Sequence, residues 1–400
     1  MNIKQLVISR IRANIRTYTM VLALIFIWIL FGILTKGVFF APRNISNLFR
    51  QMTMIGYLAC GMLLVLVTGG IDLSVGSVTG FVCVIVAYLQ ANILPALLVA
   101  WLPNSSLAFQ SSIITIIAVI SGLLVGLAAG VAQGYTIAYL GVPAFIVTLG
   151  GQLIFRGGVL GITRGKTIVP IVEPFKNIAQ GYISRTTGII ITFIIIALIF
   201  LGTALNRRKL KKIGLQQDTL MKDYAKSVIV SAFVLLYVIV MNSYRGIQNP
   251  VLLLVVIAFI TNYISKNTRF GRYIYALGGN REATRLSGID IKKNTFLVYG
   301  LMGILSGVSG IVLTGYIAAG TIAGGMNYEL DAIASCVIGG VSLSGGSGSV
   351  IGALIGAVVM ASLVNGMSVM NMDVFWQNIV KGIILILAVY VDVNTKRKNA

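Results

Sequence analysis

Few ionisable side chains in this chain could carry chemistry. Its 400 residues include 31 Lys and Arg, 10 Asp and Glu, and no histidine. Histidine is the commonest general base and metal ligand in proteins, so most hydrolytic and metal-dependent reactions lack their usual residue. Cys60, Cys83 and Cys336 stand alone in apolar segments, without CxxC spacing. We expect no catalytic residue, metal or cofactor, and interpret the cysteines as small buried hydrophobic residues.

Asp72 is the one acidic residue between Met1 and Glu173, and an apolar run there gives way to a new helix start. Two roles are open. Together with Ser74, it can accept the free N–H groups of the following helix. Ionisable residues near a membrane are also costly and often functional, so it can instead bind substrate or a proton. Capping is our first interpretation, and both residues remain candidates for a translocation path.

Amide side chains within or beside apolar runs could offer hydrogen bonds to a cargo. They are Asn47, Gln51, Gln133, Asn365 and Gln377. A path must offer such bonds without holding the cargo tightly. The same side chains can also bond between helices, which is the simpler role for each. Lys381 lies near the start of the last apolar run and could extend outward to water, so we assign it no function.

Hydropathy indicates the elements that position these residues. The chain is 57% hydrophobic and 10% charged, with a mean hydropathy of +0.95, unlike a water-soluble domain of this size. About 20 helical residues cross the hydrocarbon of a bilayer. The candidate spans are 20–40, 53–71, 75–90, 112–134, 143–163, 187–205, 227–241, 250–264, 296–319, 331–344, 347–370 and 375–391. We predict an all-α, polytopic membrane helix bundle of about 10 to 12 transmembrane helices, forming a single domain over residues 1–400.

Basic clusters predict the orientation. Residues 1–18, 206–226, 266–293 and 396–398 hold 21 of the 31 basic residues. An even number of spans separates them, so all four can face the cytoplasm of a bacterial plasma membrane. This makes both termini and the loops 206–226 and 265–295 cytoplasmic. It also leaves one basic loop outside, which contains Arg156, Arg164, Lys166, Lys176 and Arg185. Spans 227–241 and 250–264 are short enough to form a tight hairpin or to be partly re-entrant.

Glycine follows two patterns in the apolar runs. Stripes such as Gly122-x3-Gly126-x3-Gly130 and Gly348-x3-Gly352-x3-Gly356 allow helices to approach closely. Separately, residues 69–77 and 339–347 are identical at six of nine positions. This match indicates either an internal duplication, with broken helices at a substrate site between the repeats, or a chance similarity of glycine-rich sequences.

The loop 265–295 contains the most specific sequence of the chain. Gly278-Gly279 would break the chain, Asn280 is a good N-cap, Glu282 suits a first helical turn, and Gly288 can end the helix in a left-handed conformation. Such a short, rigid helix could transmit motion from a soluble partner. The alternative is a solvated basic loop. The residues concerned are Gly278, Gly279, Asn280, Glu282, Ala283, Arg285, Leu286, Ser287 and Gly288.

The pattern Gly-x-Asn-x-x-Ala-x-x-x-Ser-Gly-Ile over residues 278–289 resembles the coupling-loop signature of permease subunits of binding-protein-dependent ABC sugar importers of the ribose, galactose and xylose type. Stretches 44–48, 70–77, 142–150 and 338–346 agree with it. The basic segment 206–248 and the tail 375–382 are most similar to xylose-type members. Gly70 departs from the family where many relatives carry an acidic residue, which puts a paired carboxylate with Asp72 in doubt.

The resemblance implies a homodimer of this subunit in the lipid bilayer, a cytoplasmic ABC ATPase subunit and an extracytoplasmic sugar-binding protein. The implied cargo is a monosaccharide, first of all D-xylose, with ribose, galactose or a nucleoside as alternatives. ATP would be hydrolysed on a separate chain, since this sequence has no GxxxxGK[ST] motif. Nucleic acid is not an expected partner, because the basic residues lie in short loops between spans. The rival hypothesis is a self-contained secondary transporter in which Asp72 titrates.

Overall fold

The computed structural model describes residues 15–397 except 213 and 215–219. These residues form helices, and the only β-type pairings among them are two isolated bridges, Ile168 with Gly320 and Tyr182 with Gln248. The all-α prediction is confirmed. Of the basic clusters, Lys4, Arg10, Arg12 and Lys398 lie outside the described residues.

Nine helical segments of the described chain are long and apolar enough to cross a membrane. They are α3 (Pro42–Val67), α4 (Val75–Tyr88) continued by η2 (Leu89–Ile93) and α5 (Leu94–Trp101), α6 (Leu107–Ala138), α7 (Ala144–Thr163), α9 (Arg185–Lys212), α10 (Leu220–Asn242), α11 (Asn249–Asn267), α14 (Ile291–Ile317) and α16 (Val350–Val369). Helices α2 (Ile15–Leu34) and α17 (Val374–Arg397) contain shorter apolar stretches, Met20–Leu34 and Val374–Tyr390. The chain is therefore a polytopic helix bundle, as predicted.

The structure refines two details of the predicted spans. Helices α10 and α11 have 23 and 19 residues, so neither is the short hairpin or re-entrant segment that the sequence allowed. The predicted span 331–344 instead ends early, since α15 (Tyr328–Ile338) has 11 residues and is only about 16 Å long. It stops at the Gly339-Gly340 pair, where Gly340 takes a left-handed φ of 80°.

Helices α3 and α14 form the centre of the bundle, and glycine allows α14 to lie directly on α6. A Cβ atom on Gly130 would lie 2.3 Å from the Tyr299 carbonyl oxygen, and one on Gly303 would lie 2.3 Å from that of Gly126. The predicted packing role of the Gly122–Gly130 stripe is confirmed. The stripe on α16 is similar, because a Cβ atom on Gly356 would lie 1.9 Å from the Ser335 carbonyl oxygen.

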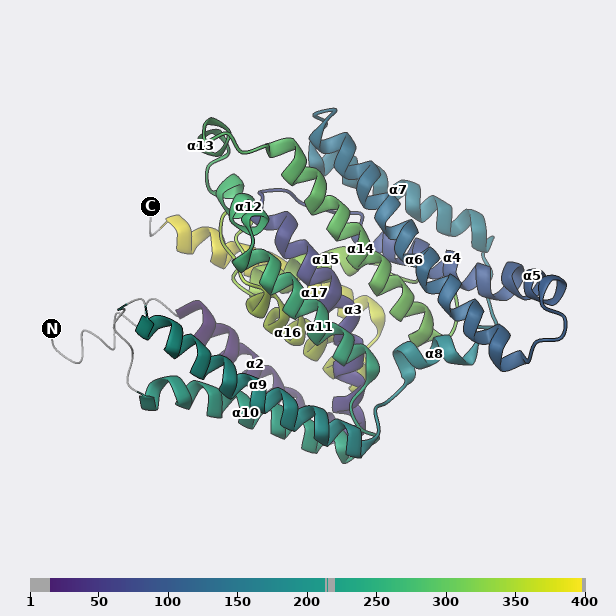
Figure 1. Cartoon of the computed structure of the whole chain (residues 1–400), viewed down its shortest axis with the longest axis horizontal. Coiled ribbons are helices and arrows are strands. Elements are labelled where there is room, and N and C mark those ends of the chain that lie inside the picture. Colours follow the sequence, from purple (N-terminus) through teal and green to yellow (C-terminus); the bar gives the residue numbers. More distant parts are fainter. Residues whose placement is uncertain (1–14, 213, 215–219, 398–400) are drawn as a thin grey trace.

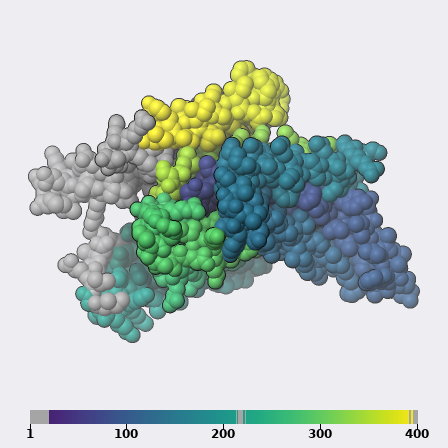
Figure 2. Space-filling model, turned by 90° about the horizontal axis from the view of Figure 1, so that it is seen from above, coloured from purple at the N-terminus to yellow at the C-terminus, as the bar shows by residue number. Residues whose placement is uncertain are grey.

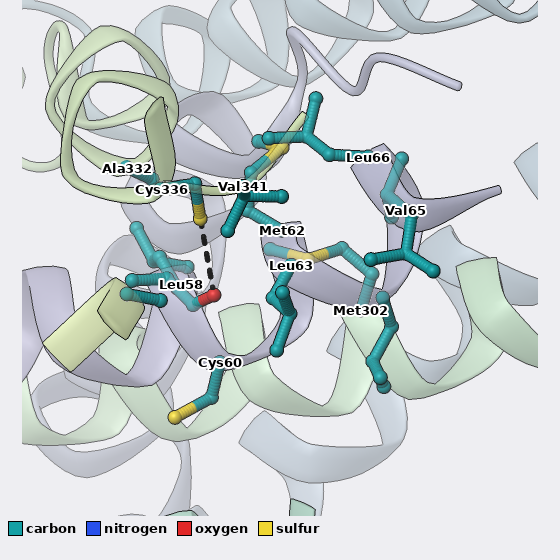
Figure 3. Close-up of a cluster of buried hydrophobic side chains, with 14 of the residues drawn as sticks. Leu58, Cys60, Met62, Leu63, Val65, Leu66, Met302, Ala332, Cys336 and Val341 are labelled. Carbon is teal, nitrogen blue, oxygen red and sulfur yellow. Dashed lines mark hydrogen bonds between the residues drawn. The ribbon is translucent and has the colours of Figure 1, made fainter. Parts of the chain in front are cut away.

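All three cysteines are buried and free, as predicted. Figure 3 shows one part of the core, where apolar side chains of α3 meet Met302, Ala332 and Val341. Cys336 lies in this cluster, with its Sγ atom 3.4 Å from the Ala59 carbonyl oxygen (Figure 3).

The helices place the described parts of the four predicted basic clusters at one end of the molecule. Figure 1 shows the start of α2, the end of α9, the start of α10 and the end of α17 on the same side as α12 (Arg269–Gly279) and α13 (Arg281–Leu286). We call this the basic end. Helix α5, helix α8 (Glu173–Gln180) and the connection between α10 and α11 lie toward the opposite end (Figure 1).

Candidate functional site

Helix α13 at the basic end has the caps that the sequence predicts. The Asn280 Oδ1 atom accepts the N–H of Ala283 at 2.9 Å, and Gly288 takes a left-handed φ of 77° after the last turn. The prediction for the chain break is wrong by one residue. Gly278 and Gly279 complete α12, and the backbone turns at Asn280, with φ −154° and ψ 102°.

The outer surface of α13 is open. Glu282 and Arg285 form an exposed ion pair at 2.6 Å, and the Leu286 side chain is 77% exposed. Figure 1 shows α13 projecting beyond the ends of the neighbouring helices. A short helix with charged residues and an exposed leucine can dock against a soluble protein.

Helix α12 connects α13 to the interior through a contact between three backbones. A Cβ atom on Gly278 would lie 1.7 Å from the Val67 carbonyl oxygen at the end of α3, and that oxygen also accepts the N–H of Gly346 at 2.9 Å. A Cβ atom on Gly345 would lie 2.8 Å from the Gly278 carbonyl oxygen. We call this contact of Val67, Gly278, Gly345 and Gly346 the glycine junction.

The two similar glycine-rich loops have similar backbones. Gly69 and Gly340 both have a φ of 80° and end α3 and α15 with the same pair of main-chain hydrogen bonds. The following turns also match, since the Ser74 N–H donates to Asp72 Oδ1 at 2.8 Å and the Ser344 N–H donates to Ser342 Oγ at 3.2 Å. The sequence match aligns Gly69 with Gly339, but the residue with the same backbone conformation is Gly340, so the helix ends are offset by one residue. The turns at Asp72 and Ser342 follow the sequence match without an offset.

Three of the predicted path residues belong to one hydrogen-bond network between α3, α14 and α16. Asn365 accepts from Asn44 at 2.8 Å and donates to Gln51 at 3.5 Å. Gln51 donates to the Tyr316 hydroxyl at 3.2 Å, and that hydroxyl lies 3.4 Å from the Asn47 Oδ1 atom. Asn47, Gln51 and Asn365 are therefore brought together, as interhelical bonding predicts.

Asp72, Ser74 and Gln133 form a second network near the glycine junction. The Ser74 hydroxyl lies 2.7 Å from Asp72 Oδ1 and bonds to the Gln133 amide. Ser74 makes no side-chain bond to the first turn of α4, so its predicted capping role is wrong, and Asp72 caps only the N–H of Ser74. Asp72 is buried in the loop between the α3 and α4 spans. Burial raises the pKa of its carboxyl to about 6, although the bonds from Ser74 oppose this rise.

Gln377 stands apart from both networks. Its Nε2 atom donates to the Met372 carbonyl oxygen at 2.9 Å, just before α17. It therefore closes the turn at the start of its own helix.

The structure also places four polar residues that the sequence analysis did not select. Lys381 of α17 forms an ion pair with Asp331 of α15 at 2.9 Å, so it bonds inward and does not extend outward, as the sequence allowed. On the other side of α15, Gln152 of α7 donates to Glu329 at 3.1 Å. In the sequence, the signal for these contacts was the presence of two acidic residues, Glu329 and Asp331, beside an apolar run. Helix α15 is thus held from both sides at its first turn.

A groove of about 710 Å³ lies beside α13 at the basic end. Its walls include Gly69 and Gly70, the connection between α6 and α7, and the start of α14. Arg281, Arg285 and Lys292 also line it, together with Asp290, so basic residues outnumber acidic ones in its walls. The groove leads from the surface of α13 to the loop that carries Asp72.

Residues 44–389 match a family described as branched-chain amino acid transport system / permease component. The chain belongs to this permease family. The permease is 42% identical over 388 residues to the xylose transport system permease protein XylH of Haemophilus influenzae, covering 96% of this chain and 98% of that protein. It is 40% identical to XylH of Escherichia coli (96% and 94% covered), and 32% identical to the ribose import permease protein RbsC of Escherichia coli (88% and 87% covered). No solved structure matches it.

The family match covers both glycine-rich loops, helix α13 and all seven predicted path residues of the permease. It also covers the ion pair of Lys381 and Asp331. The permease is a multi-pass membrane transport protein, and its polar networks lie inside the region that defines its family.

Proposed function

We propose that this permease is the membrane-spanning subunit of an ATP-driven importer that carries D-xylose across the bacterial plasma membrane. Relatives named for xylose transport are 40–42% identical over nearly the whole chain, whereas a relative named for ribose import is 32% identical. The observation that carries the mechanism is the glycine junction, because it joins the exposed helix α13 to two loops in the interior of the bundle.

In this proposal the basic end faces the cytoplasm, with both termini and the loops 206–226 and 265–295. A separate ABC ATPase docks on α13, using Glu282, Arg285 and the exposed Leu286. Movement of α12 then shifts the loops after α3 and α15 together, because the glycine junction leaves no side chain between them to absorb the displacement. A sugar-binding protein delivers cargo at the opposite end.

The path runs past the polar networks. Sugar hydroxyls exchange hydrogen bonds readily with amide side chains, which Asn47, Gln51, Asn365 and Gln133 supply. Helix α15 carries Glu329 and Asp331 in its first turn, and the loop that follows it reaches the glycine junction. Its bonds to Gln152 on α7 and Lys381 on α17 link the loop to the two helices that contain these residues.

A second copy of the permease completes the path in this proposal. Helix α17 lies along the surface of the molecule (Figure 2). Helix α7 is also largely exposed, and Gln152, Arg156 and Lys381 on these two helices bond inward but keep part of their surface exposed. A partner subunit that covers this side would shield them from hydrocarbon.

Reconstitution with the binding protein and the ATPase tests this proposal. Labelled xylose should accumulate in vesicles only with both partners and ATP. Glu282→Lys should weaken ATPase binding and uncouple hydrolysis from uptake while the permease stays inserted. Glu173→Lys is the matched control, because it breaks an exposed pair of the same spacing with Lys176 at the opposite end. Normal coupling in Glu282→Lys would remove the role of α13.

A secondary transporter is the second candidate, favoured only by the buried, raised-pKa carboxyl of Asp72. Asp72→Asn keeps an oxygen to accept from Ser74 but cannot titrate. We expect Asp72→Asn to retain uptake when the ATPase is present. We expect the wild type to lose uptake when the ATPase is deleted. Uptake that survives the deletion and collapses with a protonophore or in Asp72→Asn would favour the secondary transporter.

A further inference from the structure

A second pocket, of about 410 Å³, lies at the end of the molecule opposite α13. It is lined by Val38, Ala41, Arg43, Asn44, Asn47, Arg50, Tyr182 and Tyr244. No Asp or Glu is among these residues. The pocket therefore combines two guanidinium groups with amides and aromatic rings, and holds no carboxylate to neutralise them.

Arg50 lacks partners for part of its guanidinium group. Its Nε and Nη2 atoms are buried and donate no hydrogen bond to any described residue. The group lies 4.8 Å from the centre of the Tyr182 ring, which satisfies its charge only in part. Buried, unpaired guanidinium N–H groups are costly, and a bound anion would satisfy them.

Further arginines surround the same two tyrosines. Arg245 lies 5.9 Å from the Tyr182 ring and 5.5 Å from the Tyr244 ring, and Arg185 donates to the Tyr244 carbonyl oxygen at 3.3 Å. No salt bridge within the described chain involves Arg43, Arg50 or Arg245. This positive charge stands at the end where the positive-inside rule predicts few basic residues, so orientation in the membrane does not explain it.

The walls of the pocket are fixed by main-chain bonds between two loops. The Ile183 N–H donates to the Ile247 carbonyl oxygen at 2.8 Å, and the Asn249 N–H donates to that of Gly181 at 3.1 Å. Gly246 has a φ of 106°, and a Cβ atom there would lie 2.4 Å from the Ile183 carbonyl oxygen. The pocket is therefore formed before any ligand binds.

We propose that this pocket binds the phosphate of an anionic phospholipid headgroup. Guanidinium groups bind phosphate oxygens in pairs, and tyrosine is enriched at the level of the headgroups. The adjoining helices supply a surface for the acyl chains, because Ile189, Ile190 and Phe193 of α9 and Leu236 and Ile239 of α10 are exposed. That apolar surface favours a lipid over a free anion or an acidic side chain of a soluble protein.

The test uses the full-length permease, purified in detergent and stripped of lipid, and measures its thermal midpoint and bound lipid by native mass spectrometry. Phosphatidylglycerol should raise the midpoint and stay bound, whereas phosphatidylcholine and inorganic phosphate should do so weakly. Arg50→Gln and Arg43→Gln should each weaken phosphatidylglycerol binding about tenfold, as the loss of one charge-assisted bond predicts. Arg43 is exposed, so its variant folds even if Arg50→Gln does not.

Arg164→Gln is the matched control, since this exposed arginine lies outside the pocket. Three results would overturn the proposal. The first is equal binding of both lipids. The second is stabilisation by inorganic phosphate that phosphatidylglycerol does not exceed, which would assign the pocket to a free anion. The third is normal lipid binding by both pocket variants with lost docking of the soluble sugar-binding protein, which would assign the arginines to that protein. The lipid-binding readouts do not require transport of the cargo.

Discussion

The ion pair of Lys381 and Asp331 shows how the bundle accommodates charge. The Asp331 side chain is 3% exposed and that of Lys381 is 20% exposed, so their attraction offsets part of the cost of taking both charges out of water. The pair also joins α15 to α17 at the point where α15 begins its short course into the bundle. One contact therefore compensates two charges and fixes the position of a helix.

Removal of one partner of this pair should be far more damaging than removal of both. Lys381→Met leaves a buried carboxylate uncompensated and should destabilise the protein by about 3–5 kcal/mol. The double variant Lys381→Met with Asp331→Leu should recover much of this loss. Thermal midpoints in detergent measure both effects. Lys176→Met, which breaks an exposed pair, should cost no more than about 1 kcal/mol. Equal losses of stability in Lys381→Met and Lys176→Met would contradict a stabilising role for the buried pair.

Residue conformations that depend on near neighbours in the chain could be predicted from the sequence. The Asn280 cap and the left-handed Gly288 depend on neighbours within one helical turn, and both are confirmed. Lys381 and Asp331 are 50 residues apart, and Asn44 and Asn365 are 321 apart. No pattern in a single sequence pairs such residues, because the pairing follows from how the helices pack.

At the scale of elements, hydropathy predicts a span best when the helix is long and uninterrupted. Helices α6 and α14 cover nearly all of their apolar runs, whereas α15 stops at Ile338, before the end of its predicted span 331–344. The Gly339-Gly340 pair ends it, and apolar composition does not register that stop. Likewise, the repeated loops were visible in the sequence, but their meeting with Gly278 was not.

The glycine junction gives a sharp comparison between adjacent residues. Gly278→Ala should displace α12, because its Cβ atom would lie 1.7 Å from the Val67 carbonyl oxygen, whereas Gly279→Ala meets nothing within 4 Å. We expect Gly278→Ala to abolish coupled uptake and lower the thermal midpoint, and Gly279→Ala to leave both near the wild-type values. ATP-driven uptake in vesicles checks the first effect. Wild-type uptake by Gly278→Ala would show that the contact is dispensable.

At the scale of the whole molecule, charge and structure agree on two distinct ends. Described residues of the clusters 206–226 and 266–293 lie at the basic end with α13 (Figure 1). The phosphate-binding pocket that we propose lies at the other end. The positive-inside rule assigns the basic end to the cytoplasm, and the pocket accounts for some of the arginines that this rule leaves outside.

Labelling of single cysteines tests this orientation. Ser287→Cys at the end of α13 should react with a membrane-impermeant maleimide only after cells are opened. Asn104→Cys, in the loop between α5 and α6, should react in intact cells. Both positions are exposed, and the three native cysteines are buried, so the background is low. The reverse pattern would invert the topology and place α13 beyond the reach of a cytoplasmic ATPase.

The contact of Gly278 with Val67 and Gly346 has a consequence for how such a transporter changes over time. Main-chain atoms alone form it, so its geometry does not depend on which side chains line the route of the solute. If this contact couples α13 to the path, as we propose, a substitution that alters selectivity elsewhere in the bundle need not change it. Under this proposal, related permeases can differ in the solute that they transport while they keep the same coupling contact.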